Sequence, residues 1–406
     1  MSNRTVLISG ASIAGPALAY WLREHGFTPT VVEIAPGLRP GGQAVDLRGA
    51  GRTVVERMGL LPQVRELKVD ERGVANVDAR GRRRAEMPAD LFGGEGIVAE
   101  IEIMRGDLTQ VLAEATTDVE YLFDDRIIEM AETPDGVRVT LASGLVRSFD
   151  LVIGADGVHS GVRRLAFGPE ADYVRPLGAY TAYFTVPDPG DLEHWFLMYN
   201  EPGGLCAAIR PERGGTAKAM LTFTSPPLAY DRRDIGAQQE ILRRRYARSG
   251  WRVPAMLAAM PHADDFYFDS ICQVHVDRWW RGRVALLGDA GYCGSPLTGM
   301  GTSMSLVGAY VLAGELAATR DDHEAAFARY QEEMRAYVAQ CQELPPGGVK
   351  GMAPDSRFMI RMRDLSMRMM TRWPMKSMAA KMFSRADAIT LKDYAGTRVT
   401  AARSAG

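Results

Sequence analysis

The sequence has few cysteines and almost no net charge. None of its 4 cysteines forms a CxxC pair, so a disulfide framework, a zinc knuckle and a thioredoxin-type redox pair all lack support. We therefore expect no bound metal. Lys and Arg number 48 against 50 Asp and Glu, a net charge of −2 among 406 residues. A near-neutral chain argues against a nucleic acid partner, because proteins that bind a phosphate backbone need an excess of basic residues.

A long apolar run that could cross a membrane is also missing. Residues 6–22 carry no charged side chain, but Gly10, Gly15 and Pro16 interrupt them, whereas a span needs about 20 mostly apolar residues. The only charged residue before this stretch is Arg4, too little for the start of a signal peptide. We therefore expect a cytoplasmic protein with no membrane contact.

What the first segment does resemble is a βαβ unit. We expect a strand over residues 5–9, a glycine turn over residues 10–15, a helix over residues 16–25 and a second strand over residues 30–34. Further helices are expected over residues 52–60 and 107–115. Two fully apolar runs, residues 151–154 and 284–287, are typical of parallel strands buried on both faces. The pattern predicts an α/β fold with a doubly wound parallel sheet.

The middle of the chain has another pattern. Residues 194–199, 205–210 and 216–224 are strand-like and are separated by turns rich in Gly and Pro. They predict an antiparallel sheet. Because this sheet lies between two pieces of the parallel-sheet domain, we expect it to be an inserted second domain.

Three motifs carry the chemistry. The first is Gly10-Ala-Ser-Ile-Ala-Gly15, with Glu33 at the end of the second expected strand. Glycines let a pyrophosphate approach the backbone at a helix N-terminus, and the acid can bind a ribose. Ser12 stands where the pattern expects a third glycine. A glycine turn of this kind also occurs in α/β proteins that bind no dinucleotide.

The second and third motifs are more specific. The second is Asp150-Leu-Val-Ile-Gly-Ala-Asp-Gly157, followed by Ser160 and Val162-Arg163. The third is Gly282-Arg-Val-Ala-Leu-Leu-Gly-Asp-Ala290, followed by Pro296 and Gly299-Met-Gly301. With the first motif, in this order, they resemble the fingerprints of the FAD-dependent aromatic hydroxylases. These are single-component flavoprotein monooxygenases with the p-hydroxybenzoate hydroxylase fold.

A finer resemblance points to the tetracycline-inactivating branch and to polyketide hydroxylases. Gly41-Gly42, Asp46-Leu47 and Met58-Gly59-Leu60 are similar to its segment after the second strand, and Arg105 with Asp107-Leu108 is similar to its Arg-x-Asp-Leu. The resemblance implies a Rossmann-like FAD-binding domain over residues 1–72, 103–172 and 276–345. The substrate domain would take residues 73–102 and 173–275, and a helical segment over residues 346–406 would bridge the two.

The resemblance also implies which residues hold the cofactor. Ser12, Ile13, Ala14 and Gly15 would line the FAD pyrophosphate, Glu33 would hold the adenosine ribose, and Asp289 would bind the ribityl chain. The remaining contacts would be Arg39, Arg105, Asp156, Gly299, Met300, Gly301 and Thr302. For Asp156 a structural role in its own turn is an equal alternative, and Arg39 could equally be a solvated loop residue. The chain departs from the family at Tyr292, where a histidine is common, and at Ser303, where an asparagine is usual. We expect both changes to lie near the flavin.

The implied reaction consumes NAD(P)H and O₂. NAD(P)H would visit transiently to reduce FAD, and a flavin C4a-hydroperoxide would then hydroxylate an aromatic or polyketide-like substrate. Substrate contacts are expected from the antiparallel sheet and from the loop after the third motif: Tyr183, Trp195, Met198, Met220, Phe223 and Pro296. Each of these could instead be core. His194 and His275 are candidate bases by residue type alone, so no catalytic base is named.

Two other functions stay open from the sequence. A non-catalytic FAD protein that sequesters a hydrophobic ligand would carry the same motifs. A flavin-dependent halogenase is disfavoured, because Arg278-Trp-Trp-Arg281 does not match the halogenase WxWxIP pattern. The substrate and the oligomeric state are not predicted.

The C-terminal segment is unusually basic and rich in methionine. Residues 356–385 hold eight basic residues, one acid and eight methionines. Phe358, Met362, Leu365 and Met369 recur at helical spacing, and Trp373-Pro374 should end or kink that helix. We expect a helix packed across both domains; the alternatives are a lid over the substrate or a helix on a membrane surface.

Overall fold

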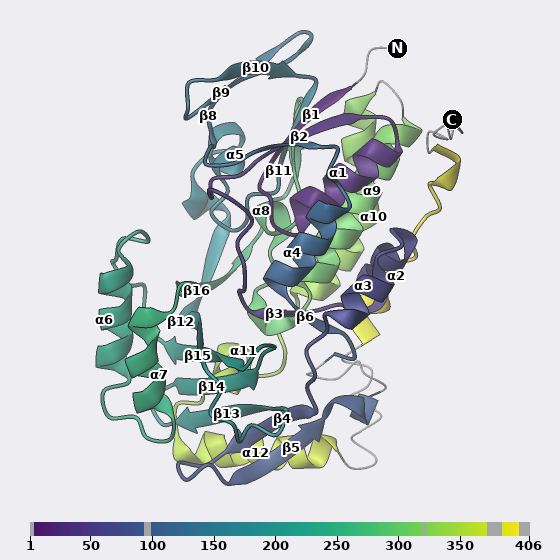
Figure 1. The fold of residues 1–406 in the computed structure, drawn as a ribbon. Helices are drawn as coiled ribbons and strands as arrows, with labels where there is room; N and C mark the ends of the chain where they lie inside the picture. The colour runs from purple at the N-terminus through teal and green to yellow at the C-terminus, as the bar shows by residue number, and fades with distance from the viewer. Residues whose placement is uncertain (1–3, 93–98, 320–321, 372–383, 398–406) are drawn as a thin grey trace.

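The computed structural model describes residues 4–92, 99–319, 322–371 and 384–397. A parallel sheet forms the upper half of the molecule in Figure 1. Its strand order is β17-β18-β11-β1-β2-β7, parallel except for the β17–β18 pair. These strands are β1 (Thr5–Ser9), β2 (Thr28–Val32), β7 (Glu120–Leu122), β11 (Leu151–Gly154), β17 (Trp280–Arg281) and β18 (Val284–Leu286). The expected parallel sheet of an α/β fold is therefore confirmed.

Helices bury one face of this sheet. The helix α9 (Gly301–Ala318) is buried along almost its whole length, between α1 (Ala14–Glu24), α2 (Gly49–Arg57) and α10 (His323–Gln342). A helix that is apolar all round belongs in the interior. The other helices of this half are α3 (Leu61–Glu66), α4 (Arg105–Glu114), α5 (Gly161–Ala166) and α8 (Asp289–Tyr292). A small antiparallel sheet of β8 (Ile127–Thr133), β9 (Gly136–Leu141) and β10 (Val146–Phe149) completes it.

The second half is a seven-stranded sheet of order β16-β12-β15-β14-β13-β4-β5. Its strands are β4 (Gly73–Val77), β5 (Arg83–Pro88), β12 (Val174–Pro187), β13 (Trp195–Glu201), β14 (Leu205–Pro211), β15 (Thr216–Thr224) and β16 (Tyr267–Val274). All neighbours pair antiparallel except β13 with β4. The expected inserted antiparallel sheet is thus confirmed, whereas the domain boundaries stay a prediction.

The two faces of the seven-stranded sheet differ. The helices α6 (Ile235–Arg245) and α7 (Val253–Ala259) cover one face with an apolar core. The other face looks towards the parallel-sheet half and carries α11 (Gly348–Met352) and α12 (Arg357–Met370). Between the halves lies a two-stranded ladder of β3 (Ala44–Asp46) and β6 (Glu102–Met104).

The C-terminal helix α12 forms where expected. In Figure 1, α12 lies against β13, β4 and β5. It packs through Met367, which is 3% exposed. Of the predicted apolar stripe, Phe358 and Met362 line the cavity described below, whereas Leu365 and Met369 are partly exposed and do not line it. The role of this segment as a bridge between the halves, or as a lid, stays a prediction. Trp373-Pro374 lies outside the described residues. Among the described residues, no helix combines the length and apolarity that a membrane span requires.

Candidate active site

The glycine turn between β1 and α1 has no room for side chains at two positions. Gly10 has a φ of +108°, and a Cβ there would lie 2.5 Å from the carbonyl oxygen of Ala155. A Cβ at Gly15 would lie 1.9 Å from the carbonyl oxygen of Gly10. These close approaches require glycine. They bring the N-terminus of α1, with its unpaired backbone N–H groups, to the edge of the sheet, where it suits an anion.

Glu33 ties this turn to the end of β2. Its carboxylate accepts hydrogen bonds from the backbone N–H of Ala11 at 2.8 Å and of Ala35 at 2.9 Å. Arg39 lies 3.4 Å from the same carboxylate. Glu33 is therefore fixed in orientation, with its remaining lone pairs available to a hydroxyl group.

Arg105 approaches the turn from the start of α4. Its Nη1 donates to Ser12 Oγ at 3.1 Å, so the serine that replaces the expected glycine holds an arginine. A Cβ at Gly42 would lie 2.7 Å from Arg105 Nε. Burial and the charge of nearby Arg39 lower the pKa of Arg105. Two cations held this close favour a ligand with more than one negative charge.

Asp156 has a structural role in its turn. Its carboxylate accepts from Ser160 Oγ, from the backbone N–H of Val162 at 3.1 Å and from Ser9 Oγ at 3.3 Å. Burial raises its pKa, which these hydrogen bonds oppose. These bonds hold the start of α5 in place. Asp156 therefore has a structural role in its turn in addition to lining the cavity.

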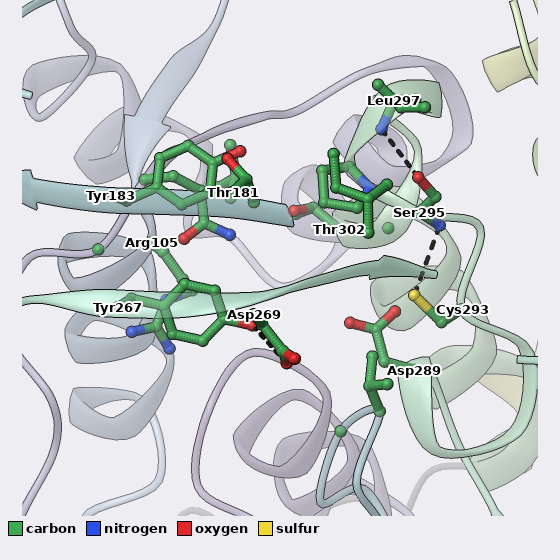
Figure 2. Close-up of a pocket in the computed structure, with 18 of the residues that line it drawn as sticks. Arg105, Thr181, Tyr183, Tyr267, Asp269, Asp289, Cys293, Ser295, Leu297 and Thr302 are labelled. Atoms are coloured by element: carbon green, nitrogen blue, oxygen red, sulfur yellow. Dashed lines mark hydrogen bonds between the residues drawn. The ribbon is translucent and has the colours of Figure 1, made fainter. Parts of the chain in front are cut away.

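The third motif contributes a carboxyl and a helix N-terminus. Asp289 follows Gly288, whose φ is +63°, and burial raises the pKa of the Asp289 carboxyl. The loop then turns through Ser295, a non-glycine residue at φ +83° whose Oγ accepts from the backbone N–H of Leu297 at 3.2 Å. Figure 2 shows Asp289 and Thr302 around the same space as Tyr183 and Tyr267. Strained backbone of this kind collects at functional sites.

The start of α9 completes this wall. Gly299 has a left-handed φ of +65°, and Met300 and Gly301 follow it into the first turn of the helix. Free N–H groups and the helix dipole both favour negative charge at this end.

One cavity of about 1960 Å³ collects these elements. Small-molecule sites are usually about 300–1,000 Å³, so this cavity has room for a dinucleotide and a second ligand. Every residue expected to hold the cofactor lines it except Gly15, which acts through backbone packing. The lining set is Ser12, Ile13, Ala14, Glu33, Arg39, Arg105, Asp156, Asp289, Gly299, Met300, Gly301 and Thr302.

The expected substrate residues divide between the two faces of the sheet. Tyr183, Met198, Met220 and Pro296 line the cavity. Trp195 and Phe223 do not, because they pack in the core beneath α6 and α7. Successive side chains of a strand point to opposite faces. Trp195 and Phe223 were therefore wrongly expected in the cavity.

Sequence reasoning missed several cavity residues. Phe196, Arg210, Tyr267 and Asp269 line the cavity from the sheet, Arg363 lines it from α12, and Asp46 and Glu102 line it from the β3–β6 ladder. Strand alternation, applied outwards from Met198 and Met220, would have found Phe196. Nothing local marks Asp46 and Glu102, which meet only through the ladder.

His159 of the second motif was also missed. It bonds Asp269 at 2.8 Å and Glu170 at 3.0 Å, and Tyr267 donates to the same Asp269 carboxylate at 3.1 Å. Burial alone would lower the pKa of His159, but its two carboxylate partners raise it to about 9. The imidazolium thus anchors a tyrosine of the cavity wall.

The two departures from the family lie away from the cavity. Tyr292 is buried and its hydroxyl bonds that of Tyr330 at 2.8 Å. Ser303 is buried and donates to the carbonyl oxygen of Arg48 at 3.1 Å. Neither side chain lines the cavity, because α8 and α9 turn them into the helical core.

The two candidate histidines also lie outside the cavity lining. His194 pairs with Asp70 at 3.3 Å and is largely exposed. His275 bonds Gln273 at 3.2 Å, and burial together with Arg175 lowers its pKa. Among the described residues, no group of three His, Cys, Asp or Glu side chains could hold a metal ion.

Comparison with known families identifies the fold. The model of the FAD binding domain family matches residues 3–344. The chain belongs to this family of FAD-dependent monooxygenases. An uncharacterized protein of Mycobacterium tuberculosis is 47% identical over 353 residues, covering 86% of this chain and 95% of the relative. A flavin-dependent monooxygenase of Legionella longbeachae is 39% identical over 337 residues, covering 83% and 86%.

Solved structures agree with this assignment. The tetracycline destructase Tet(55) is 37% identical, with a TM-score of 0.81 over 97% of this chain and 99% of that one. Klebsiella pneumoniae HpxO, solved with FAD and uric acid, is 22% identical with a TM-score of 0.75 over 96% and 98%, which shows a shared fold. The resemblance to FAD-dependent hydroxylases and to the tetracycline-inactivating branch is thus confirmed.

The residues present fit FAD. The glycine turn leaves space that a Cβ would fill, Arg105 and Arg39 supply positive charge, and Glu33 and Asp289 supply acceptors for hydroxyl groups. The first turn of α9 supplies N–H donors at the opposite end. The cofactor expected from the sequence, FAD, is therefore the cofactor of this family member.

Proposed function

We propose that this FAD-dependent monooxygenase uses NAD(P)H and O₂ to hydroxylate an aromatic or polyketide-like small molecule. The observation that carries the proposal is the continuity of the cavity from the FAD motifs to the seven-stranded sheet. Bound FAD, once reduced, would activate O₂, one atom of which would be inserted into the substrate. NAD(P)H would be a transient reductant, because the chain carries a single dinucleotide turn.

The substrate wall favours a flat, mostly apolar molecule. Tyr183, Phe196, Met198 and Met220 face the cavity from the sheet, and Met367 faces it from α12. Methionine side chains are flexible and polarizable and adapt to aromatic rings. The tetracycline destructase neighbours support a polycyclic substrate.

The chain's own groups then have separate tasks. Glu33, Arg105 and Asp289 would hold the dinucleotide in place. The N–H groups at the start of α9 would stabilise negative charge on the reduced ring system, as an oxyanion site does. The sheet and α12 would keep water from the reacting atoms.

The test is oxygen transfer by the FAD-loaded protein. Tetracycline and a set of phenols are supplied with NADH or NADPH under isotopically labelled O₂, and products are analysed by mass spectrometry. The proposal predicts NAD(P)H oxidation coupled to a product carrying one labelled oxygen atom. Tight ligand binding with no oxygenated product across the set would instead support the ligand-sequestering function.

A variant of the wall checks where the substrate lies. Met220→Trp should narrow the cavity and raise KM about tenfold or more, the scale of a pocket misfit, while FAD stays bound. Phe223→Leu, on the covered face of the same strand, is the matched control and should leave KM unchanged. Equal KM effects in both variants would contradict the placement.

The cytoplasmic location and the lack of a nucleic acid partner stay predictions.

A further inference from the structure

A buried charge cluster lies where the two halves meet. Asp46 of β3 and Glu102 of β6 are directly opposite each other in the antiparallel ladder. Side chains so paired lie within a few ångströms on one face, and two like charges in that position repel. Both carboxyls line the cavity.

Two arginines partly neutralise this cluster. Arg48 lies 3.0 Å from Asp46, and Arg210 contacts both Glu102 and Glu71. With all five groups ionised, three carboxylates face two guanidinium groups, leaving one uncompensated negative charge. Burying such a charge is costly unless it takes up a proton.

The hydrogen bonds show that the cluster lacks a donor. Glu71 Oε1 is buried, in a side chain 1% exposed, and accepts no hydrogen bond from any described residue. One further proton, shared among these oxygens, would remove both the excess charge and this deficit.

The electrostatics of the cluster favour that proton on Asp46 or Glu102, the two carboxyls that line the cavity. Burial raises the pKa of Asp46 to about 7, opposed by Arg48 and reinforced by Glu102. Burial likewise raises the pKa of Glu102 to about 7, opposed by Arg210 and reinforced by Glu71. Because the two carboxyls lie opposite each other in the ladder, they titrate as a pair. An acceptor with a pKa near the working pH is the most effective general base.

The surroundings are those of a reaction site. A Cβ at Gly299 would lie 2.9 Å from Asp46 Oδ2, so this carboxyl abuts the loop that begins α9. The Arg210 guanidinium lies 4.9 Å from the centroid of the Phe196 ring, and both line the cavity. Glu71 does not line it, which leaves Asp46 and Glu102 as the carboxyls of the cluster that line the cavity.

We propose that the Asp46–Glu102 pair accepts the proton of an acidic hydroxyl group, a phenol or an enol, on the substrate. The proposal rests on the function proposed above. The substrate O–H bond breaks, its proton forms a new O–H bond on a carboxylate oxygen of the pair, and the electron pair stays on the substrate oxygen. No oxidation or reduction occurs in this step. The resulting oxyanion raises electron density in the ring that is to be oxygenated.

The shared proton is tested first, without turnover. Infrared difference spectra of the FAD-loaded protein, recorded in steps across neutral pH, should contain a carboxylic-acid band that titrates with a midpoint near 7. Asp46→Asn and Glu102→Gln should each remove it. Glu71→Gln is the matched control, because Glu71 contacts the same arginine, Arg210, as Glu102 does. This variant should keep the band but lower its midpoint, because the negative charge of Glu71 raises the pKa of Glu102. A band that survives both cavity-side substitutions, or no titrating band at all, overturns the proposal.

The pH profile of turnover then tests the role as base. With tetracycline as the probe, the rate in the wild-type enzyme should rise through a midpoint near 7. Asp46→Asn should lose this rise and about 10²-fold of the rate, and Glu71→Gln should shift the rise to lower pH. An unchanged profile in Asp46→Asn overturns the proposal even if the titrating band is present. If neither tetracycline nor any phenol of the set is oxygenated, the proposed function fails and the role as base with it, whereas the infrared result still shows whether the pair holds a proton.

Discussion

A single methyl group decides whether the cofactor turn can form. Gly15→Ala places a Cβ 1.9 Å from the carbonyl oxygen of Gly10, so α1 must move away from β1. We expect loss of FAD binding and about 1–3 kcal/mol of destabilisation, the range for overpacking. Flavin absorbance of the purified protein and chemical denaturation measure the two effects. Gly396→Ala, where an added Cβ meets nothing within 4 Å and the residue does not line the cavity, should bind FAD normally. Equal losses in both variants would contradict the placement of the cofactor turn.

The carboxyl pair makes stability depend on pH in a definite direction. Because folding raises the pKa of Asp46 to about 7, its contribution is complete below the ordinary carboxyl pKa of about 4 and is lost as the pH rises through about 7. We therefore expect Asp46→Asn to become more stable relative to the wild type between these two pH values. Urea unfolding at several pH values measures the difference. A constant difference across this window would show that the pKa is not raised.

At the scale of elements, α12 shows which contacts hold a helix. Its packing residue is Met367, whereas Leu365 is 47% exposed. Met367→Ala should therefore cost about 2–5 kcal/mol, and Leu365→Ala should stay within about 0.5 kcal/mol of the wild type. Thermal and urea unfolding compare them. The reverse order would mean that Leu365, and not Met367, is the packed residue.

The same elements show what sequence patterns can and cannot predict. The helical spacing from Phe358 to Met369 predicted a helix, which the structure has at Arg357–Met370, but spacing marks an apolar face without saying what covers it. The strand β13 was expected too, yet Trp195 and Met198 were both placed in the cavity although they point to opposite faces. Tyr292 was expected near the flavin, but only the packing of α8 on α10 shows that it bonds Tyr330.

At the scale of the whole molecule, the cofactor half was the predictable part. Its motifs are short runs of sequence, and they can be recognised without knowing the distant residues, such as Ala155 beside Gly10, that close them in space. The Asp46–Glu102 pair was not predictable, since two residues distant in the chain meet only through a short ladder. The substrate sheet was predictable as a sheet, but its cavity face depends on which side α6 and α7 cover.

A ligand that joins several segments should stabilise the whole chain. FAD would contact the turn after β1, the start of α4 and the start of α9, so its binding should oppose global unfolding. At a free FAD concentration of 100 times Kd, we expect about 2.7 kcal/mol of added stability. Thermal unfolding at increasing FAD concentration measures it, with Gly15→Ala as the variant that should not respond. Unfolding that is independent of FAD in the wild type would contradict a folded-state site.

The account as a whole depends on the position of the flavin, and a crystal structure of the protein with FAD tests it most directly. The account predicts the pyrophosphate against Ser12, Ile13 and Ala14, and the adenosine ribose on Glu33. The ring system would lie at Gly299–Gly301 and face Tyr183 and Met220 across the cavity. A structure in which FAD lies elsewhere, or in which the ring faces away from the seven-stranded sheet, would contradict it.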